Sequence, residues 1–236
     1  MPVYKIATKK VFIEPKGEIL KSRAEKYRVR EDIKKSKCDI VIDLNNEKFK
    51  EYNEKYKRYG YDALEYAYVG TDFYKALLEF DGFFLHSSVV AVDEKAYIFS
   101  ADSGVGKSTH TRLWKEYFKE RAEIINDDKP AIICGENSIR AYGTPFCGKN
   151  DINENKSVEV KALCFLERGD TNEIKKIKTD EAIRRLYVQL LYSDKENEMR
   201  KLLSLLDEFL NKVEVYVLKC TISEEAVKVA YEEMSK

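Results

Sequence analysis

The chain has 236 residues, enough to bury one good hydrophobic core with a small appended subdomain. Its 42 Lys and Arg residues balance 42 Asp and Glu residues, which argues against a nucleic acid or a membrane as partner. No apolar run is typical of a signal peptide or a membrane span, and the five scattered cysteines form no C-x-x-C pair, so we expect a cytoplasmic protein with reduced thiols.

Residues 1–80 are predicted to form a small α+β subdomain that could recognise an acceptor. Three short apolar or alternating runs predict strands, at residues 3–7, 10–14 and 38–43. Four aromatic residues then recur at helical spacing, namely Phe49, Tyr52, Tyr56 and Tyr59. They favour a helix with an aromatic packing stripe, and the alternative is a tyrosine-rich wall for an acceptor peptide. A further helix is expected over 71–80, ended by the Asp81-Gly82 turn.

A phosphate-binding loop lies at residues 101–109, between a predicted strand over 95–100 and a predicted helix over 109–120. The motif usually begins with Gly and here begins with Ala101, a tolerated variant. Its glycines allow successive amide groups to point at a phosphate, while Lys107 reaches the outer phosphates and Ser108 ligates Mg²⁺. The residues expected to bind the nucleotide are Asp102, Ser103, Gly104, Val105, Gly106, Lys107, Ser108 and Thr109.

Two adjacent carboxylates, Asp127 and Asp128, end a short apolar strand predicted over 123–128. Beside bound phosphates, one carboxylate can hold a metal ion while the other accepts the proton of an attacking hydroxyl. Taken alone, Asp127-Asp128-Lys129-Pro130 is typical of a plain turn. Their position directly after the loop and its helix favours the functional interpretation.

Two further residues are candidates for the same site. His86 lies in a predicted strand over 83–92, which the Asp93-Glu94 turn joins to the strand before the loop. A histidine at a strand edge is also commonly structural. Lys149 lies in a loop over 143–150 with Pro and two Gly, and it could contact the transferred phosphate or belong to an ordinary turn. Cys147 in that loop is not expected to be a nucleophile.

His86, the DSGVGKS run at 102–108 and the strand ending in Asp127-Asp128 together resemble the core of HPr kinase/phosphorylase. The resemblance covers roughly residues 82–150. It implies an α/β P-loop kinase core over 81–236, of the type found in HPr kinase and the C-terminal half of phosphoenolpyruvate carboxykinase. It also implies transfer of the γ-phosphoryl group of ATP to a serine hydroxyl, with Asp128 as general base, Asp127 near the metal and His86 beside the acceptor.

The departures point to a different acceptor from HPr. Ser87 stands where HPr kinases have Gly, Thr109 stands where they have Glu, and their downstream Arg-rich signature has no evident counterpart. The chain looks more like the shorter HPr-kinase-like proteins of biosynthetic clusters, some of which phosphorylate a serine of a peptide precursor. We therefore expect an ATP- and Mg²⁺-dependent kinase acting on a peptide or small protein. The alternatives are a small-molecule hydroxyl kinase and a switch that hydrolyses ATP slowly.

The remaining elements complete the predicted core. A hairpin is expected from strands over 131–134 and 139–142, and another strand follows over 158–166. Amphipathic helices are expected over 180–192 and 196–212, then a strand over 213–218 and a last helix that begins after Ser223.

Overall fold

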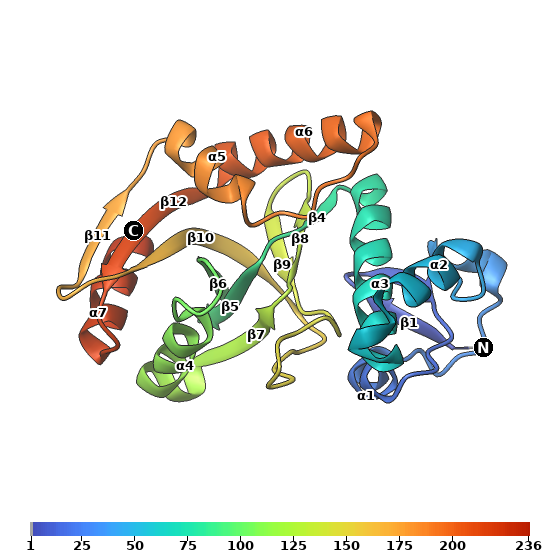
Figure 1. Cartoon of the computed structure of the whole chain (residues 1–236). Coiled ribbons are helices and arrows are strands. Elements are labelled where there is room, and N and C mark those ends of the chain that lie inside the picture. The colour runs from blue at the N-terminus through green and yellow to red at the C-terminus, as the bar shows by residue number, and fades with distance from the viewer. Residues whose placement is uncertain (1) are drawn as a thin grey trace.

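A computed structural model describes residues 2–236, and it arranges the chain around two β-sheets (Figure 1). The smaller sheet has the order β1-β2-β3, with β1 and β2 antiparallel and β2 and β3 parallel. Its strands are β1 (Val3–Ile6), β2 (Lys9–Phe12) and β3 (Ile40–Val41). Three helices accompany it, namely α1 (Glu18–Ala24), α2 (Glu47–Tyr56) and α3 (Tyr61–Leu77).

The larger sheet has nine strands in the order β4-β8-β9-β10-β6-β5-β7, with β12 paired to β10 and β11 paired to β12. Strands β6, β10 and β12 run parallel to one another, and the other pairings are antiparallel. The strands are β4 (Gly82–Phe84), β5 (Ser87–Val92), β6 (Lys95–Ser100), β7 (Ala122–Asp128), β8 (Ala131–Cys134), β9 (Ile139–Tyr142), β10 (Ser157–Arg168), β11 (Glu173–Lys176) and β12 (Glu214–Cys220). The chain is therefore a mixed α/β protein.

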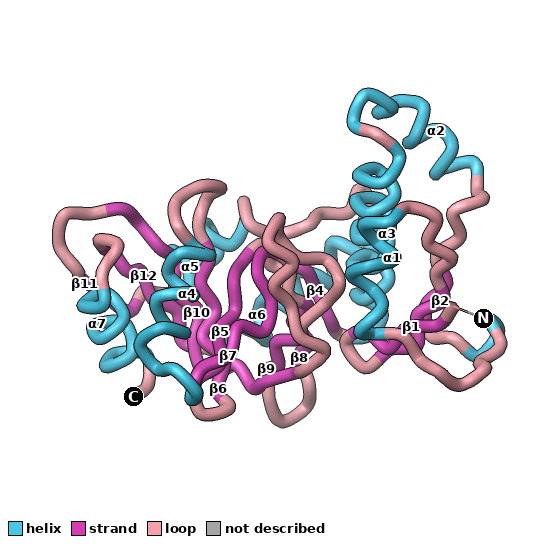
Figure 2. The backbone as a smooth tube through the Cα atoms, turned by 90° about the horizontal axis from the view of Figure 1, so that it is seen from below, coloured by secondary structure: helices cyan, strands magenta, loops and turns pink. Residues whose placement is uncertain are grey.

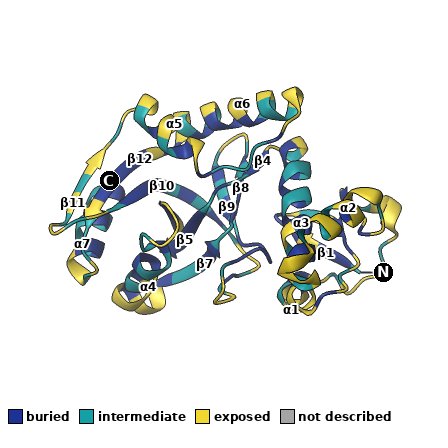
Figure 3. Ribbon diagram, in the orientation of Figure 1, coloured by how far each residue is buried: buried dark blue, intermediate teal, exposed yellow. Residues whose placement is uncertain are grey.

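Helices cover both faces of this sheet. They are α4 (Lys107–Phe118), α5 (Thr179–Tyr187), α6 (Glu196–Lys212) and α7 (Glu224–Met234), and short 3₁₀ turns lie at Glu25–Tyr27, Lys35–Lys37, Lys57–Tyr59, Leu78–Phe80 and Lys119–Arg121. Along β5, Val89 and Ala91 pack in the core that includes α5 and α6, while Val90 and Val92 pack in the core that includes α4 and α7. Because successive strand side chains point to opposite faces, a strand covered on both sides is apolar throughout. The central strands are accordingly buried in Figure 3.

A third core joins the N-terminal part to the large sheet. It contains residues of β1, β2 and α3 together with Ala131 of β8 and Phe146 of the loop after β9. Helix α3 lies between the small sheet and β4, as the view from below also shows (Figure 2). The domain boundary at residue 80 stays a prediction, since the apolar packing continues across it.

Most predicted elements are present, and four differ clearly in extent. The strand expected over 38–43 is reduced to the two residues of β3. The strand expected over 83–92 is broken into β4 and β5, because Leu85 forms a bridge with Leu190 and the amide of His86 donates to the Gln189 carbonyl. The helix expected over 71–80 is the end of α3 followed by the 3₁₀ turn Leu78–Phe80, and α3 begins ten residues earlier, at Tyr61. The helix expected over 180–192 ends at Tyr187. Helix α1 and strand β11 were not predicted. Within residues 2–236 no helix is long and apolar enough to cross a membrane.

Candidate active site

The predicted phosphate-binding loop connects the end of β6 to the first turn of α4. Gly104 has φ 81° and Gly106 has φ 133°, both in the region that side chains rarely adopt. A Cβ at either position would meet nothing within 4 Å, so the backbone conformation, and not a lack of space, requires glycine there. Helix α4 begins at Lys107, directly after Gly106, and the first amides of a helix have no partner within the helix. The loop thus ends at a positively polarised helix terminus that favours an anion.

The Lys107 side chain is buried against this loop. Its Nζ donates to the Ala101 carbonyl at 2.8 Å and to the Asp102 carbonyl at 3.4 Å. Burial lowers the pKa of the Lys107 amine, and the charges of Asp128, Asp127 and Asp102 oppose that shift. The lysine therefore lies at the base of the loop with carboxylates nearby. An anion bound in the loop would compete with the two carbonyls for the hydrogen bonds of its ammonium group.

Asp127 lies at the end of β7, and its carboxylate meets the first turn of α4. The Ser108 hydroxyl donates to Asp127 Oδ1 at 2.8 Å. The aspartate is only 4% exposed, and its backbone amide donates to the Ile152 carbonyl at 3.0 Å, which fixes its position. The structure thus brings together the two residues that were predicted to ligate Mg²⁺.

Asp128 is more open and makes different contacts. Its Oδ1 lies 3.1 Å from His86 Nε2, and its Oδ2 accepts from Lys129 Nζ. Burial raises the pKa of the Asp128 carboxyl, but the hydrogen bond from His86 and the charge of Lys129 outweigh it and hold the pKa below its usual range. Asp128 also has φ 99°, an uncommon value for a residue with a side chain. Such strained residues cluster at functional sites.

Gln189 links this aspartate pair to the loop, and the sequence analysis missed it. Its Nε2 donates to Asp102 Oδ1 at 3.1 Å, and its Oε1 lies 2.9 Å from His86 Nδ1. Because the Asp102 carboxylate only accepts, the amide oxygen must face the histidine, and His86 Nδ1 must carry a proton. The ring is then held with Nε2 toward Asp128. Because the Gln189 side chain is itself buried, it holds the His86 ring in this orientation.

The two aspartates face a cleft between the N-terminal helices and the large sheet. Its volume is about 520 Å³, and its lining residues are Ile19, Arg23, Ala63, Tyr66, Ser108, Asp127, Asp128, Lys129, Cys147, Gly148, Lys149 and Asn150. Lys149 is exposed at this cleft, so the structure brings it to the same space as the aspartates. His86 and Lys107 do not line the cleft; His86 contacts Asp128, and Lys107 contacts the carbonyls of the loop.

A second hollow of about 600 Å³ lies on another side of the loop. Its lining residues are Gly104, Val105, Gly106, Thr109, His110, Leu113, Leu166, Glu167, Arg168, Gly169, Cys220, Thr221 and Ile222. Arg168, at the end of β10, donates to the Gly104 carbonyl at 2.5 Å and to the Val105 carbonyl at 3.4 Å. The hollow therefore lies at the carboxyl ends of the parallel strands β10 and β12, the edge where open α/β sheets bind ligands.

Comparison with known proteins decides the family. The model of the family described as "SynChlorMet cassette protein ScmC" matches residues 61–229, well over half of the chain. The chain belongs to the ScmC family. The matched part of this ScmC protein begins at the first residue of α3 and ends within α7. It includes the loop, both aspartates, His86 and Gln189.

Curated proteins and solved structures give different results. No curated protein matches this ScmC chain. Among solved structures, the Hpr(Ser) kinase/phosphatase from Coxiella burnetii matches with a TM-score of 0.34 and 12% sequence identity. That match covers 65% of this chain and 99% of the other.

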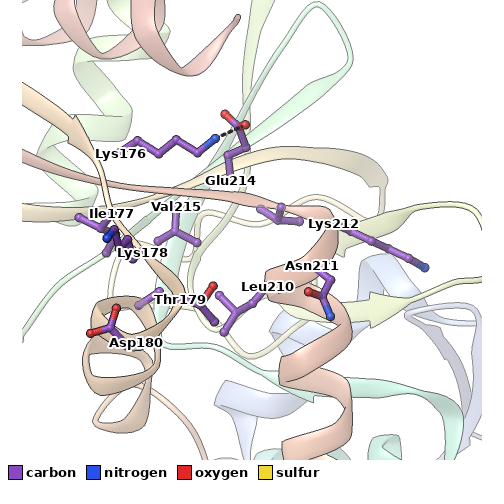
Figure 4. A pocket seen from close by; sticks show the side chains of 12 residues that line it. Lys176, Ile177, Lys178, Thr179, Asp180, Leu210, Asn211, Lys212, Glu214 and Val215 are labelled. Atoms are coloured by element: carbon purple, nitrogen blue, oxygen red, sulfur yellow. Dashed lines mark hydrogen bonds and ion pairs between the residues drawn. The ribbon is translucent and has the colours of Figure 1, made fainter.

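A hollow of about 1000 Å³ between α5, α6 and β12 is lined by none of the predicted site residues (Figure 4). The packing interpretation of the aromatic stripe holds for Phe49, which is buried, and for Tyr52, whose ring is tilted against that of Tyr56 at 5.0 Å between centroids. Tyr59, in the turn after α2, is 57% exposed and does not follow it. The Cys147 thiol is buried, which raises its pKa to about 12, so it is a poor nucleophile at neutral pH.

Proposed function

We propose that this ScmC protein is an ATP-dependent kinase that transfers the γ-phosphoryl group to a hydroxyl, most favourably a serine of a peptide or small protein. The observation that carries the proposal is the meeting of Ser108 and Asp127 at 2.8 Å, at the helix end of the loop, with Asp128 beside them in an open cleft. Phosphoryl transfer needs positioned phosphates, a metal ligand and an acceptor group for the hydroxyl proton. These groups are adjacent here.

The two hollows beside the loop suggest separate binding sites for ATP and for the acceptor. The hollow at Gly104, Leu113 and Arg168 is in the size range of small-molecule sites, and we assign the base and ribose of ATP to it. The cleft at Asp127 and Asp128 then receives the acceptor. With the loop between them, the terminal phosphate points from the first hollow toward the second.

The residues present fit a magnesium ion. Mg²⁺ is commonly bound by one or two carboxylates together with substrate phosphates, and seldom by a cage of protein ligands alone. The Ser108 hydroxyl and the Asp127 carboxylate provide such a pair, and residues 2–236 contain no group of three or more His, Cys, Asp or Glu that could hold a metal. When bound, the ion would neutralise charge on the phosphates.

The protein groups have separate tasks in the proposed transfer. The acceptor oxygen forms a bond to the γ-phosphorus, the bond from that phosphorus to the β,γ-bridging oxygen breaks, and the hydroxyl proton passes to the Asp128 carboxylate. Lys107 leaves its two carbonyl partners and adds positive charge where negative charge develops. A carboxylate with a lowered pKa is a weak base, but a loose phosphoryl-transfer transition state needs little basicity. An acceptor that displaces Lys129 from Asp128 would raise that basicity.

The size of the cleft also suits a small-molecule acceptor. A volume of about 520 Å³ can also enclose an amino acid or another hydroxyl metabolite. That activity would use the same aspartates and the same loop. Only the acceptor separates the two activities.

Incubation with Mg·ATP and candidate acceptors tests the proposal. The acceptors are serine peptides encoded beside the gene, HPr, and a mixture of free hydroxyl amino acids, each analysed by mass spectrometry for an added phosphoryl group. We expect phosphate on a peptide serine, dependent on Mg²⁺ and absent with Lys107→Ala. Labelling of free amino acids alone would favour the metabolite kinase, and efficient labelling of HPr would favour an HPr kinase. No labelled acceptor and no ADP would contradict the kinase proposal.

A further inference from the structure

An apolar hollow opens next to the cleft that contains the aspartates. Its volume is about 340 Å³, and its lining residues are Tyr66, Ala67, Gly70, Thr71, Tyr74, Phe84, Lys129, Phe146 and Leu191. Tyr66 and Lys129 line both spaces. Since Lys129 also pairs with Asp128, the apolar hollow begins one side chain away from the proposed base.

The hydroxyl groups of the lining are already bonded within the protein. Tyr74 donates to the Lys129 carbonyl and lies 3.1 Å from Thr144 Oγ1, and Thr71 donates to the Ala67 carbonyl at 2.9 Å. Tyr66 donates to the Cys147 carbonyl at 2.8 Å. A ligand group in the hollow therefore meets carbon surface and gains mainly from leaving water.

Gly70 allows α3 to pack closely against Phe146 beside the hollow. Glycine within a helix costs about 1 kcal/mol relative to alanine. A Cβ at Gly70 would lie 3.1 Å from Cδ1 of Phe146, closer than most such contacts. The glycine thus allows the fully buried Phe146 ring to pack against α3, where it also contacts Phe73 and Tyr74. These packed rings form a firm floor under the hollow.

We propose that this hollow binds a large apolar side chain, aromatic or aliphatic, of a residue next to the acceptor serine in a peptide substrate. The inference rests on the proposed kinase function and adds a sequence preference to it. The volume lies at the lower end of the range for ligand sites, which suits one side chain better than a whole metabolite or a protein surface. The shared walls at Tyr66 and Lys129 place the serine in the cleft while its neighbour occupies the hollow.

A binding experiment tests the preference without depending on catalysis. Synthetic serine peptides of one length, with Phe, Leu, Ala or Asp beside the serine, are titrated into the protein with Mg²⁺ and a non-hydrolysable ATP analogue. The methyl NMR signals of Ala67 and Leu191 report on the hollow. Ala67 is exposed on α3, so Ala67→Leu fills the hollow without entering the core, and Leu191→Ala widens it. Glu232→Leu, on the exposed face of α7, is the matched control.

The peptides with Phe or Leu should bind at least fivefold more tightly than those with Ala or Asp and should shift both methyl signals. Ala67→Leu and Leu191→Ala should each reduce that preference, and Glu232→Leu should retain it. Equal affinities for the four peptides, absence of binding, or unshifted methyl signals would overturn the proposal. Phosphate transfer is measured in parallel with ATP. A retained preference without any transfer would count against the kinase function and leave the apolar site standing.

Discussion

Replacing Asp128 by asparagine should reduce catalysis strongly while it changes folding little. Asn keeps the shape of the side chain and tolerates the positive φ of 99° better than most residues, so no backbone strain is added. The change removes the charge that His86 Nε2 meets at 3.1 Å and that Lys129 pairs with. It also removes the cost of keeping a partly buried carboxylate ionised, which offsets part of that loss. The substitution should therefore lower the free energy of unfolding by only about 1–2 kcal/mol.

The loss in rate should be larger than this. General-base groups contribute about 10²- to 10⁴-fold, which corresponds to about 2.7–5.5 kcal/mol in the activation free energy. The affinity for Mg·ATP should stay near the wild-type value, because Asp127 and Ser108 are the proposed metal ligands. Asp127→Asn serves as the comparison and should instead change the Mg²⁺ concentration that the reaction requires.

The pH dependence of stability gives an independent check on Asp128. Its pKa in the folded protein lies below the ordinary value of 3.8, so the carboxylate stabilises the fold above that pH. This contribution is lost as the pH falls through the lower, folded-state pKa. The stability difference between wild type and Asp128→Asn should therefore shrink below about pH 4. Single-turnover rates and denaturant unfolding at several pH values measure both effects, and a turnover within threefold of wild type would refute the role of Asp128.

The other predictions concern the loop and its connections. Lys107→Ala should abolish transfer and weaken Mg·ATP binding in calorimetric titration, and unchanged affinity with unchanged turnover would remove the loop from the mechanism. Gln189→Leu should lower kcat about tenfold, or about 1.4 kcal/mol, by freeing His86, with little change in ATP affinity; an unaltered kcat would show that the histidine orientation is unimportant. Gly106→Ala should cost about 1–3 kcal/mol, seen in thermal unfolding or as weaker nucleotide binding, because φ 133° strains any side chain; equal stability and affinity would contradict this.

The sequence was most informative for features formed by residues close together along the chain. The strand before the loop, the glycines at 104 and 106 and the helix after them lie within one short segment, and their φ values follow from residue type. The Asp127-Asp128 pair was also visible, since β7 is the next strand after α4. Their convergence with the loop follows from antiparallel pairing of β5 with both β6 and β7.

Contacts distant in sequence were not predictable in the same way. Gln189 reaches His86 across 103 residues, from a segment that the pattern assigned to a helix. The backbone of the same segment also breaks the apolar run over 83–92, through the Leu85–Leu190 bridge and the bond from the His86 amide to the Gln189 carbonyl. Tyr66 lies in the half of α3 that the sequence analysis left unassigned, and its place between two hollows depends on how α3 packs against Phe146. Only the tertiary packing could reveal these residues.

A crystal structure with Mg²⁺ and a non-hydrolysable ATP analogue would test the central claim most directly. We predict the β-phosphate within the amides of residues 102–108, the metal on Ser108 and Asp127, and the γ-phosphate facing Asp128 and the cleft. The base should lie in the hollow beside Leu113 and Arg168. A nucleotide bound away from the loop, or a metal held by Asp128 with Asp127 turned away, would contradict this account.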